Sequence, residues 1–295
     1  LLGGGAVMDM SKVVAVAGGA SIDDVIDHLP DFKRSVRLVL VPTTCGTGSE
    51  VTEIAAINRT RLGCKAGIAG PEMFADDAVL VPELLYGLPD HVFATSSLDA
   101  LVHSVESTLS PNSTPYTRMF GYEAMKMIIS GYKAVAEAGP AGSPERRAKR
   151  NELMRDFLIA SDYAGISFDT GGCAAVHALS YQLGGKYHVP HGESNYAMFT
   201  GVLRNYMEIK PEGEILKMNQ FIADILGCDV ADVYDALETL INKLLPKKTL
   251  HEYGVTEQDL PEFADRVIKT QERLMKNCFV PLDYDRVLKI FKELY

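Results

Sequence analysis

The sequence lacks several features that would assign it to other classes of protein. No apolar run approaches the roughly 18–20 residues of a membrane-spanning helix, so we expect no membrane partner. Basic residues are in deficit, because 29 Lys and Arg face 39 Asp and Glu and leave a net charge of −10. An acidic surface repels polyanions, and we therefore expect no nucleic-acid partner. Internal repeats and low-complexity segments are absent as well, which argues against fibrous and disordered proteins.

Cysteine is scarce, and its spacing suggests no structural role. The five residues form an odd set without a CxxC pair: Cys45, Cys64, Cys173, Cys228 and Cys278. Such a set is typical of reduced thiols in the cytoplasm rather than of a disulfide framework. The 295 residues, 47% of them apolar, suffice for one large domain or two ordinary ones. We expect a cytoplasmic enzyme with a substantial core.

The beginning of the chain is unusual. Leu1 and Leu2 are followed at once by Gly3, Gly4 and Gly5, with no initiator Met. A glycine turn of this kind normally follows a strand. We therefore expect that the first βα portion of the domain is missing from this chain; a frayed glycine terminus is the alternative.

The chain is expected to divide into two parts at about residue 92. Residues 1–92 hold short apolar runs typical of buried strands, at 36–41 and 78–81, and a short helix that begins after the cap Ser21. These features predict an α/β domain with a parallel sheet covered on both faces. Residues 93–295 are dominated by helical periodicity. The helices predicted there are 98–109, 116–138, 146–168, 213–226, 230–245, 257–276 and 285–294.

Two loops have the composition of phosphate-binding segments. The glycines 3–5 precede a predicted helix that contains residues 10–14, and bare amides at a helix N-terminus suit a pyrophosphate. The loop 42–50 follows a predicted strand and offers four hydroxyls, those of Thr43, Thr44, Thr47 and Ser49. A tight turn explains the first loop as well, and a polar helix cap the second, since neither has a standard nucleotide-binding spacing.

Two segments hold residues suited to a metal site. Asp99 and His103 are four positions apart on a predicted helix capped by Ser96, which places both side chains on one face. A glycine-dense segment further on holds three of the seven histidines: His177, His188 and His191. Imidazoles with one carboxylate suit Fe²⁺, Zn²⁺ or Co²⁺ better than Ca²⁺ or Mg²⁺. The alternative for Asp99 and His103 is a capping or surface interaction.

Taken together, these motifs resemble those of the iron-containing (group III) alcohol dehydrogenase family. The matching segments are GGGAVMDMSK at 3–12, VPTTCGTGSEVT at 41–52, DALVHSVE at 99–106 and HALSYQLGGKYHVPHG at 177–192. They occur in the family's order and cover essentially the whole chain. The resemblance implies a dehydroquinate synthase-like architecture, with an N-terminal dinucleotide-binding domain, a helical domain and a cleft between them.

The resemblance also implies which residues hold the cofactors. The metal ligands, for Fe²⁺ in the cell and Zn²⁺ in some purified samples, would be Asp99, His103, His177 and His191. The contacts to NAD or NADP would be made by Gly4, Gly5, Ala6, Thr43, Thr44, Thr47 and Lys65. The sequence leaves NAD and NADP undistinguished, because the residues that contact the adenosine ribose would lie before Leu1.

Two positions depart from the family pattern. Ala6 replaces the usual serine of the glycine loop, which removes one hydrogen bond to the cofactor. Tyr181 replaces a histidine that lies near the nicotinamide in the family and takes part in proton release. We expect the proton to leave through Tyr181, through His188, or through the ribose and water. In the alternative interpretation, Tyr181 only fills the pocket.

Within the family, segments 74–85, 96–117 and 176–195 resemble the NAD-dependent 4-hydroxybutyrate dehydrogenase branch. The reaction expected from this resemblance is hydride transfer between NAD(P) and a small primary alcohol or aldehyde, here 4-hydroxybutyrate and succinate semialdehyde. A terminal carboxylate needs a cationic or amide anchor. The candidates are Lys186, His188 and Asn195. A solvated surface position is the alternative for the lysine.

Two other classes stay open. A metal- and NAD-dependent lyase of the dehydroquinate synthase type has the same architecture, but it needs a dense basic cluster for a phosphorylated substrate, and only scattered Lys and Arg flank these motifs. A non-catalytic homologue is the second alternative, against which the intact ligand set argues. As partners we expect a small-molecule alcohol or aldehyde substrate and further copies of this chain, in a homodimer or a larger homo-oligomer.

Overall fold

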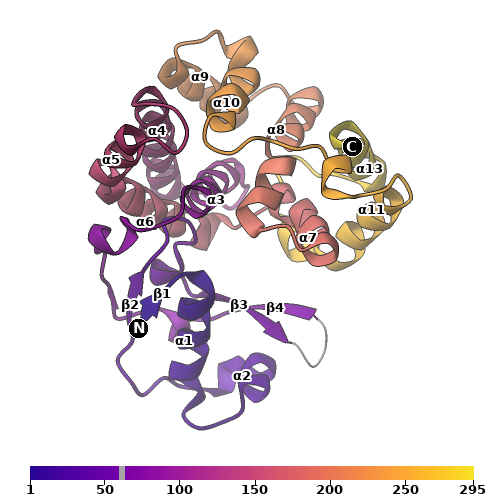
Figure 1. Ribbon diagram of the computed structural model, residues 1–295. Coiled ribbons are helices and arrows are strands. Elements are labelled where there is room, and N and C mark those ends of the chain that lie inside the picture. Colours follow the sequence, from indigo (N-terminus) through magenta and orange to yellow (C-terminus); the bar gives the residue numbers. More distant parts are fainter. Residues whose placement is uncertain (60–63) are drawn as a thin grey trace.

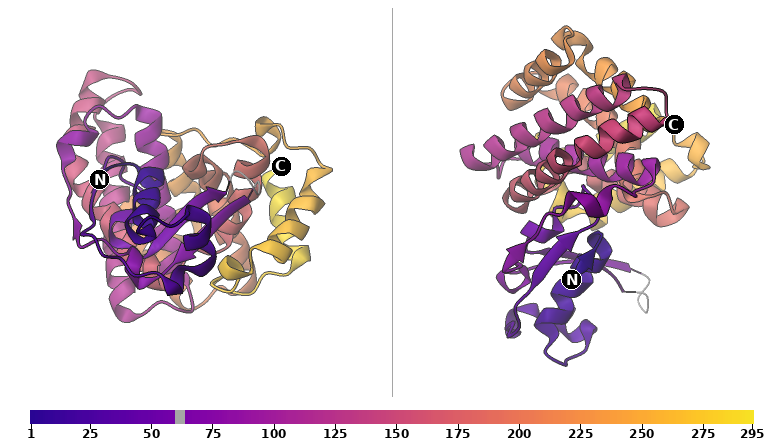
Figure 2. Two further views of the ribbon diagram at one scale, coloured as in Figure 1. Left: turned by 90° about the horizontal axis from the view of Figure 1, so that it is seen from below. Right: turned by 60° about the vertical axis from the view of Figure 1, so that its left-hand side comes forward.

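The computed structural model describes residues 1–59 and 64–295, with the side chains of 58, 59 and 64–66 outside that description. A small α/β part comes first along the chain, and a larger assembly of helices follows it (Figure 1). The second view in Figure 2 shows the α/β part at one end of the helical part. The predicted combination of a small parallel sheet with a mainly helical second part is confirmed.

The parallel sheet lies close to the helical part. Its strands pair in the order β1–β2–β5 and comprise Leu2–Gly3, Val39–Pro42 and Asp77–Ala78. Leu40, in the middle of β2, is fully buried. The strand predicted at 36–41 is observed at Val39–Pro42, and the strand predicted at 78–81 is observed at Asp77–Ala78. Both predicted strands are too long, because only two residues of each neighbouring strand pair with β2.

Two helices and a hairpin complete the α/β part. They are α1 (Gly5–Ala17), α2 (Ile22–His28), β3 (Ile54–Arg59) and β4 (Cys64–Ala69). Ser21 caps α2 as predicted, since its hydroxyl accepts the Asp24 N–H at 3.1 Å. Val13 of α1 belongs to one buried cluster with Ala55 and Ile57 of β3. The antiparallel hairpin was not predicted, because alanine and glycine within β3 and β4 weaken the strand signal.

The helical part is arranged around α3 (Asp90–Leu109), which is buried along most of its length. It packs against α4 (Pro115–Glu137), α6 (Met154–Gly171) and α8 (His191–Ile209). The other helices are α5 (Pro144–Glu152), α7 (Ala175–Tyr187), α9 (Glu214–Leu226), α10 (Val233–Asn242), α11 (Asp259–Thr270), α12 (Glu272–Met275) and α13 (Tyr284–Leu294). In the described part of the chain no single helix is long and apolar enough to cross a membrane, although α1 and the following segment 22–31, bent by 85°, meet the length and composition criterion together.

Several helix boundaries differ from the predicted ones. Ser96 is not a cap, because α3 begins at Asp90 and the Ser96 hydroxyl donates to the Phe93 carbonyl inside the helix at 3.2 Å. Hydroxyls that bond to a preceding carbonyl in this way are compatible with a continuing helix. The helices predicted at 146–168 and 257–276 each divide in two, into α5 and α6 and into α11 and α12. Neither α7 nor α8 was among the helices predicted from periodicity, because their sequences are rich in glycine and polar residues.

Arg150 of α5 is buried and binds the segment that connects the α/β part to α3. Its guanidinium donates to the Asp90 carboxylate at 2.6 Å and to the carbonyl oxygens of Leu88 and Tyr86 at 2.9 and 3.1 Å. Three acceptors satisfy a charge that would otherwise be costly to bury. The arginine therefore fixes the start of α3, the helix that carries two of the predicted metal ligands.

Candidate metal centre

The structure brings the predicted metal ligands together from three helices. Asp99 and His103 lie one turn apart on α3, His177 lies on α7, and His191 is the first residue of α8. Asp99 Oδ1 is 3.5 Å from the Nε2 atoms of both His177 and His191, and 3.8 Å from Nε2 of His103. Residues nearly a hundred positions apart in the sequence thus converge on one carboxylate oxygen.

Burial differs across this cluster in a way that suits a site with one open side. The side chains of Asp99, His103 and His177 are almost inaccessible, whereas that of His191 is 40% exposed. The His103 ring stacks on Phe168 at a centroid distance of 4.3 Å and on His177 at 4.8 Å. Three of the predicted ligands are therefore fixed by packing, and the fourth, His191, lies on the solvent-accessible side.

The mutual electrostatics favour the charged carboxylate. Burial alone would raise the pKa of Asp99, but the neighbouring His103, His191 and His177 hold it well below its ordinary value. Burial alone would lower the pKa of His103, and the Asp99 charge raises it instead. A buried carboxylate kept ionised among imidazoles is the donor set of a divalent cation site.

Glu106 is a further candidate for a functional role, which the sequence analysis quoted within a motif without giving it one. It lies on α3, two turns after Asp99, and its side chain is buried. Its carboxylate accepts the His177 Nδ1–H at 2.6 Å and the backbone N–H groups of Ala174 and Val176 at 2.9 and 2.5 Å. The carboxylate therefore holds the start of α7 and directs Nε2 of His177 toward the cluster, an arrangement typical of histidines that bind metals.

Asn195, predicted as a substrate contact, lies inside the ligand cluster. It is fully buried one turn after His191 on α8. Its Nδ2 donates to Asp99 Oδ1 at 2.8 Å and lies 3.2 Å from Nε2 of His177 and 3.4 Å from Nε2 of His191. Its Oδ1 is buried without a hydrogen-bond partner among the described residues. The amide thus contacts three of the four predicted ligands.

The other predicted substrate and proton-transfer residues lie at increasing distance from this cluster. Tyr181 lies one turn after His177, with its ring 5.9 Å from the His191 ring, and burial raises the pKa of its phenol. Lys186 points to α11, where it is 2.5 Å from the Asp259 carboxylate. His188 is exposed and ends α7 with a left-handed backbone, φ 55°. Tyr181 therefore lies beside the metal-ligand cluster, whereas Lys186 forms an ion pair with Asp259, away from it.

The two predicted cofactor loops lie side by side. The Thr43 N–H donates to the Gly3 carbonyl at 3.0 Å, and a Cβ on Gly5 would meet the Thr47 methyl at 2.6 Å. Gly4 is the N-cap residue of α1 and supplies no side-chain bond, so the first amides of the helix remain available. The Thr44 hydroxyl is buried without a hydrogen-bond partner among the described residues.

Three further residues lie on elements next to these loops; two were predicted as cofactor contacts and one was not. Ala6 lies in the first turn of α1, and Lys65 lies on β4, where its side chain is outside the described residues. Asp9 was not predicted as functional; it accepts the Ser49 hydroxyl at 2.6 Å and the Ala56 N–H at 2.9 Å. This carboxylate ties α1 to the second loop and to β3, so its role in the glycine-loop motif is to position the backbone.

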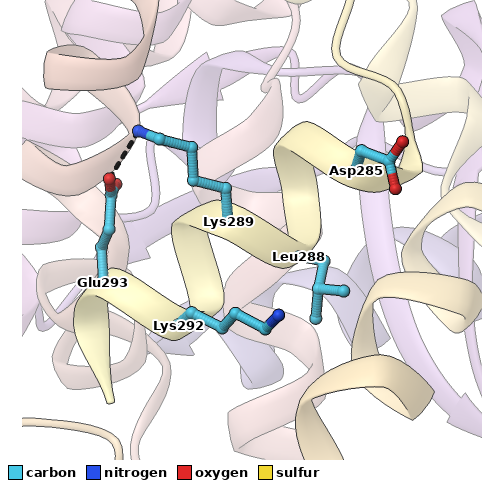
Figure 3. A pocket seen from close by; sticks show the side chains of 5 residues that line it. All are labelled: Asp285, Leu288, Lys289, Lys292 and Glu293. Carbon is cyan, nitrogen blue, oxygen red and sulfur yellow. Dashed lines mark hydrogen bonds and ion pairs between the residues drawn. The ribbon is translucent and has the colours of Figure 1, made fainter.

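A hollow on the outer surface has no part in this arrangement. It lies along α13 and is lined by Asp285, Leu288, Lys289, Lys292 and Glu293 (Figure 3). The lysine and glutamate drawn with a dashed line form an ion pair one helical turn apart. None of the predicted site residues lines this hollow.

The donor set fits the metal that the resemblance implies. Three imidazoles, which are borderline donors, together with one ionised carboxylate suit Fe²⁺ or Zn²⁺. Two of the imidazoles have a fixed tautomer, because Nδ1 of His103 donates to the Gly46 carbonyl at 3.2 Å and Nδ1 of His177 donates to Glu106. Comparison with known families agrees. Residues 93–295 match the C-terminal part of the Fe-containing alcohol dehydrogenase family, and residues 2–82 match iron-containing alcohol dehydrogenases.

The chain belongs to the iron-containing alcohol dehydrogenase family. It is 44% identical over 294 residues to 4-hydroxybutyrate dehydrogenase of Clostridium kluyveri, covering 100% of this chain and 77% of the relative. It is 32% identical to sulfoacetaldehyde reductase of Bilophila wadsworthia, covering 98% of this chain and 74% of the relative. The predicted family and its oxidoreductase class are confirmed.

Solved structures agree with the fold of this family. Sulfoacetaldehyde reductase from Bifidobacterium kashiwanohense in complex with NAD⁺ is 26% identical, with a TM-score of 0.84 over 99% of this chain and 74% of that one. An archaeal alcohol dehydrogenase from a Red Sea brine pool has the same TM-score at 21% identity, covering 100% of this chain and 76% of that one. The second likeness concerns the fold alone.

Proposed function

We propose that this iron-type alcohol dehydrogenase interconverts 4-hydroxybutyrate and succinate semialdehyde, with NAD(P) as the hydride carrier. The observation that carries this proposal is the buried cluster of Asp99, His103, His177 and His191 in a chain 44% identical throughout to a 4-hydroxybutyrate dehydrogenase. The named relatives are oxidoreductases, which favours this reaction over the lyase alternative.

The four clustered side chains would hold Fe²⁺, or Zn²⁺ in its place. The ion supplies Lewis-acid chemistry, which lowers the pKa of an alcohol bound to it. The protein's part is to hold the donors in place: Glu106 and the Gly46 carbonyl fix two imidazoles, and Phe168 shields His103 from water. The exposed edge of His191 marks the side from which substrate enters.

The cofactor would lie between the part at 1–92 and the part at 93–295. The first amides of α1, at Gly5 and Ala6, are free to receive the pyrophosphate, and the buried Thr44 hydroxyl lacks a partner that a cofactor would provide. Gly4, Thr43, Thr47 and Lys65 complete the proposed contacts. The relation to a relative solved with NAD⁺ favours NAD.

Proton transfer is assigned to Tyr181, whose ring lies beside that of His191. In alcohol oxidation its hydroxyl would take up the substrate proton, and His188 at the exposed end of α7 is the alternative route. A Tyr181→Phe variant should lower kcat by about 10²–10³-fold while leaving metal content unchanged. Equal activity would assign Tyr181 to pocket filling alone.

The substrate carboxylate is assigned to Lys186, between the predicted ligands His177 and His191, and to Asn195 after them. For Asn195 this requires its Nδ2 to exchange the bond to Asp99 for one to the substrate. For Lys186 this requires release from its ion pair with Asp259, which is 2.5 Å away. Lys186→Met should raise KM for 4-hydroxybutyrate far more than KM for butanol. Equal changes in both values would remove the lysine from the substrate site.

An anaerobic assay of the Fe²⁺-loaded protein tests the function as a whole. It measures the reduction of NAD⁺ and of NADP⁺ separately with each of four alcohols: 4-hydroxybutyrate, butanol, 1,2-propanediol and glycerol. We expect turnover of 4-hydroxybutyrate that is lost on chelation and in His191→Ala. Turnover of plain alcohols alone would keep the family chemistry and reject the substrate. Light scattering tests the homo-oligomer, and fractionation of cells tests the cytoplasmic location, which we include in the proposal.

A further inference from the structure

His177 belongs to two groups of potential metal ligands. In one group the ligand atoms of Asp99, His177 and His191 all lie within 4.8 Å of one another. In the other, one nitrogen of His103, one nitrogen of His177 and the Cys173 sulfur satisfy the same limit. The cysteine took no part in the predicted metal site, and the proposed reaction does not use it.

The position of Cys173 is fixed by the backbone around it. It lies between α6 and α7, directly after Gly172, whose left-handed backbone has φ 76°. Its carbonyl oxygen accepts the Asn277 side-chain N–H at 2.9 Å. A Cβ on Gly172 would collide with that asparagine, so only glycine permits this approach. The thiol is thus held against two imidazoles rather than placed there by a mobile loop.

Each of the two imidazoles in the group with Cys173 has a single nitrogen to offer. Nδ1 of His103 donates to the Gly46 carbonyl, and Nδ1 of His177 donates to the Glu106 carboxylate. Both acceptors are oxygens without a proton to give, so Nε2 of each ring carries the free lone pair. One lone pair binds one cation. Because His103 and His177 also belong to the four predicted ligands around Asp99, an ion bound by the cysteine group would compete with that site for both imidazoles.

We propose that Cys173, His103 and His177 form a second metal site, which takes a thiophilic divalent ion such as Cd²⁺ or Zn²⁺ at the expense of the site around Asp99. On binding, the Cys173 thiol loses its proton to solvent and its sulfur bonds to the ion as a thiolate. One proton is therefore released for each ion bound. Thiolate with imidazole is a softer donor set than imidazole with carboxylate, which separates the ions that the two sites prefer. The competition rests on the proposed iron site, whereas the thiolate site itself does not depend on the substrate.

Cadmium titration of the metal-free full-length protein under anaerobic conditions tests the site by absorption rather than by activity. We expect a near-ultraviolet thiolate-to-cadmium band that saturates at one ion per chain. The band should disappear in Cys173→Ser and remain in the matched control Cys228→Ser, whose thiol lies after α9. A wild-type protein without the band, or a band unchanged by Cys173→Ser, would overturn the proposal.

Alkylation of the wild-type protein provides a test that needs no variant. Saturating Cd²⁺ should protect Cys173 from iodoacetamide at least tenfold, as mapped by mass spectrometry, and leave Cys228 reactive. Fe²⁺ added first should weaken the apparent Cd²⁺ affinity. Equal alkylation with and without Cd²⁺ would reject the thiolate site, and an unchanged Cd²⁺ affinity would reject the competition. Neither result depends on 4-hydroxybutyrate turnover by the iron-loaded enzyme. Failure of the proposed function would appear in the turnover assay alone, and failure of the thiolate site in these metal-binding tests alone.

Discussion

At the scale of single residues, Glu106 controls the candidate centre without reaching a metal ion. Its two oxygens receive three N–H groups, one from the His177 ring and two from the backbone at the start of α7. A buried carboxylate with three donors is well compensated for the loss of water. The same bonds orient the imidazole, so the residue joins local folding to metal binding.

Glu106→Gln should weaken Fe²⁺ binding by about 10–100-fold, as loss of a partner behind a ligand histidine commonly does. The amide N–H₂ would face at least one N–H group, which turns an attraction into a repulsion. Metal affinity by competition with a chelator measures the effect. Glu152→Gln is the control, because Glu152 is an exposed residue that pairs only with Lys149 among the described contacts. Equal affinities in the two variants would contradict the assignment.

The buried carboxylate of Glu50 leads to a prediction about how the stability of the fold depends on pH. It is buried with both carboxylate oxygens unpartnered among the described residues, and burial raises its pKa from 4.5 to about 7. A raised pKa means that the folded state holds the proton more tightly than the unfolded state. This residue's contribution to stability is therefore largest below pH 4.5 and declines as the pH rises to about 7.

Glu50→Gln should remove this decline. At pH 8 the free energy of unfolding should exceed that of the wild type by up to roughly 3 kcal/mol, the equivalent of the pKa change. At pH 4 the two proteins should be nearly equal. Denaturant unfolding across this pH range gives the comparison. A variant less stable than the wild type at pH 8 would show that the ionised carboxylate makes a favourable interaction.

At the scale of elements, the centre depends on how closely the start of α8 approaches α3. Gly192 follows His191, and a Cβ there would collide with the Thr95 carbonyl. In the second loop, a Cβ on Gly46 would likewise collide with the Ser96 carbonyl. These glycines serve close backbone contact, and the spacing of His191 to Asp99 follows from it.

Gly192→Ala should therefore push α8 away from α3 and weaken Fe²⁺ binding at least tenfold, with a lower melting temperature. Gly185→Ala on α7 is the matched control, because a Cβ there meets nothing within 4 Å and alanine favours a helix. Calorimetry and metal titration of both variants distinguish the two effects. If both alanines behave alike, close packing at α8 is not what positions His191.

The elements also show where sequence patterns succeed. The cap at Ser21 and the helix at 116–138 were predicted closely, because their signals are local. The long glycine-rich segment that contains α7 and α8 gave no periodic signal, since those helices are stabilised by α3 and by the carboxylate of Glu106 rather than by their own propensity.

At the scale of the whole molecule, the candidate site joins three helices, so metal binding and folding are linked. An ion that binds only the folded state stabilises it by about 2.7 kcal/mol at a hundred times its Kd. Fe²⁺ at that level should raise the melting temperature, and chelation should reverse the change. His191→Ala, which removes the exposed ligand, should reduce the shift strongly. A metal-independent melting temperature in the wild type would argue against binding at this cluster.

The sequence alone determined the family and, with it, the combination of a small sheet with helices, because four motifs in the family's order are written locally along the chain. The four candidate ligands followed from that resemblance. Only the tertiary structure decided that Asn195 lies among those ligands, that Lys186 is paired with Asp259, and that Cys173 faces two imidazoles. These are contacts between separate helices and loops. Their geometry follows from packing of the whole core, which no local pattern specifies.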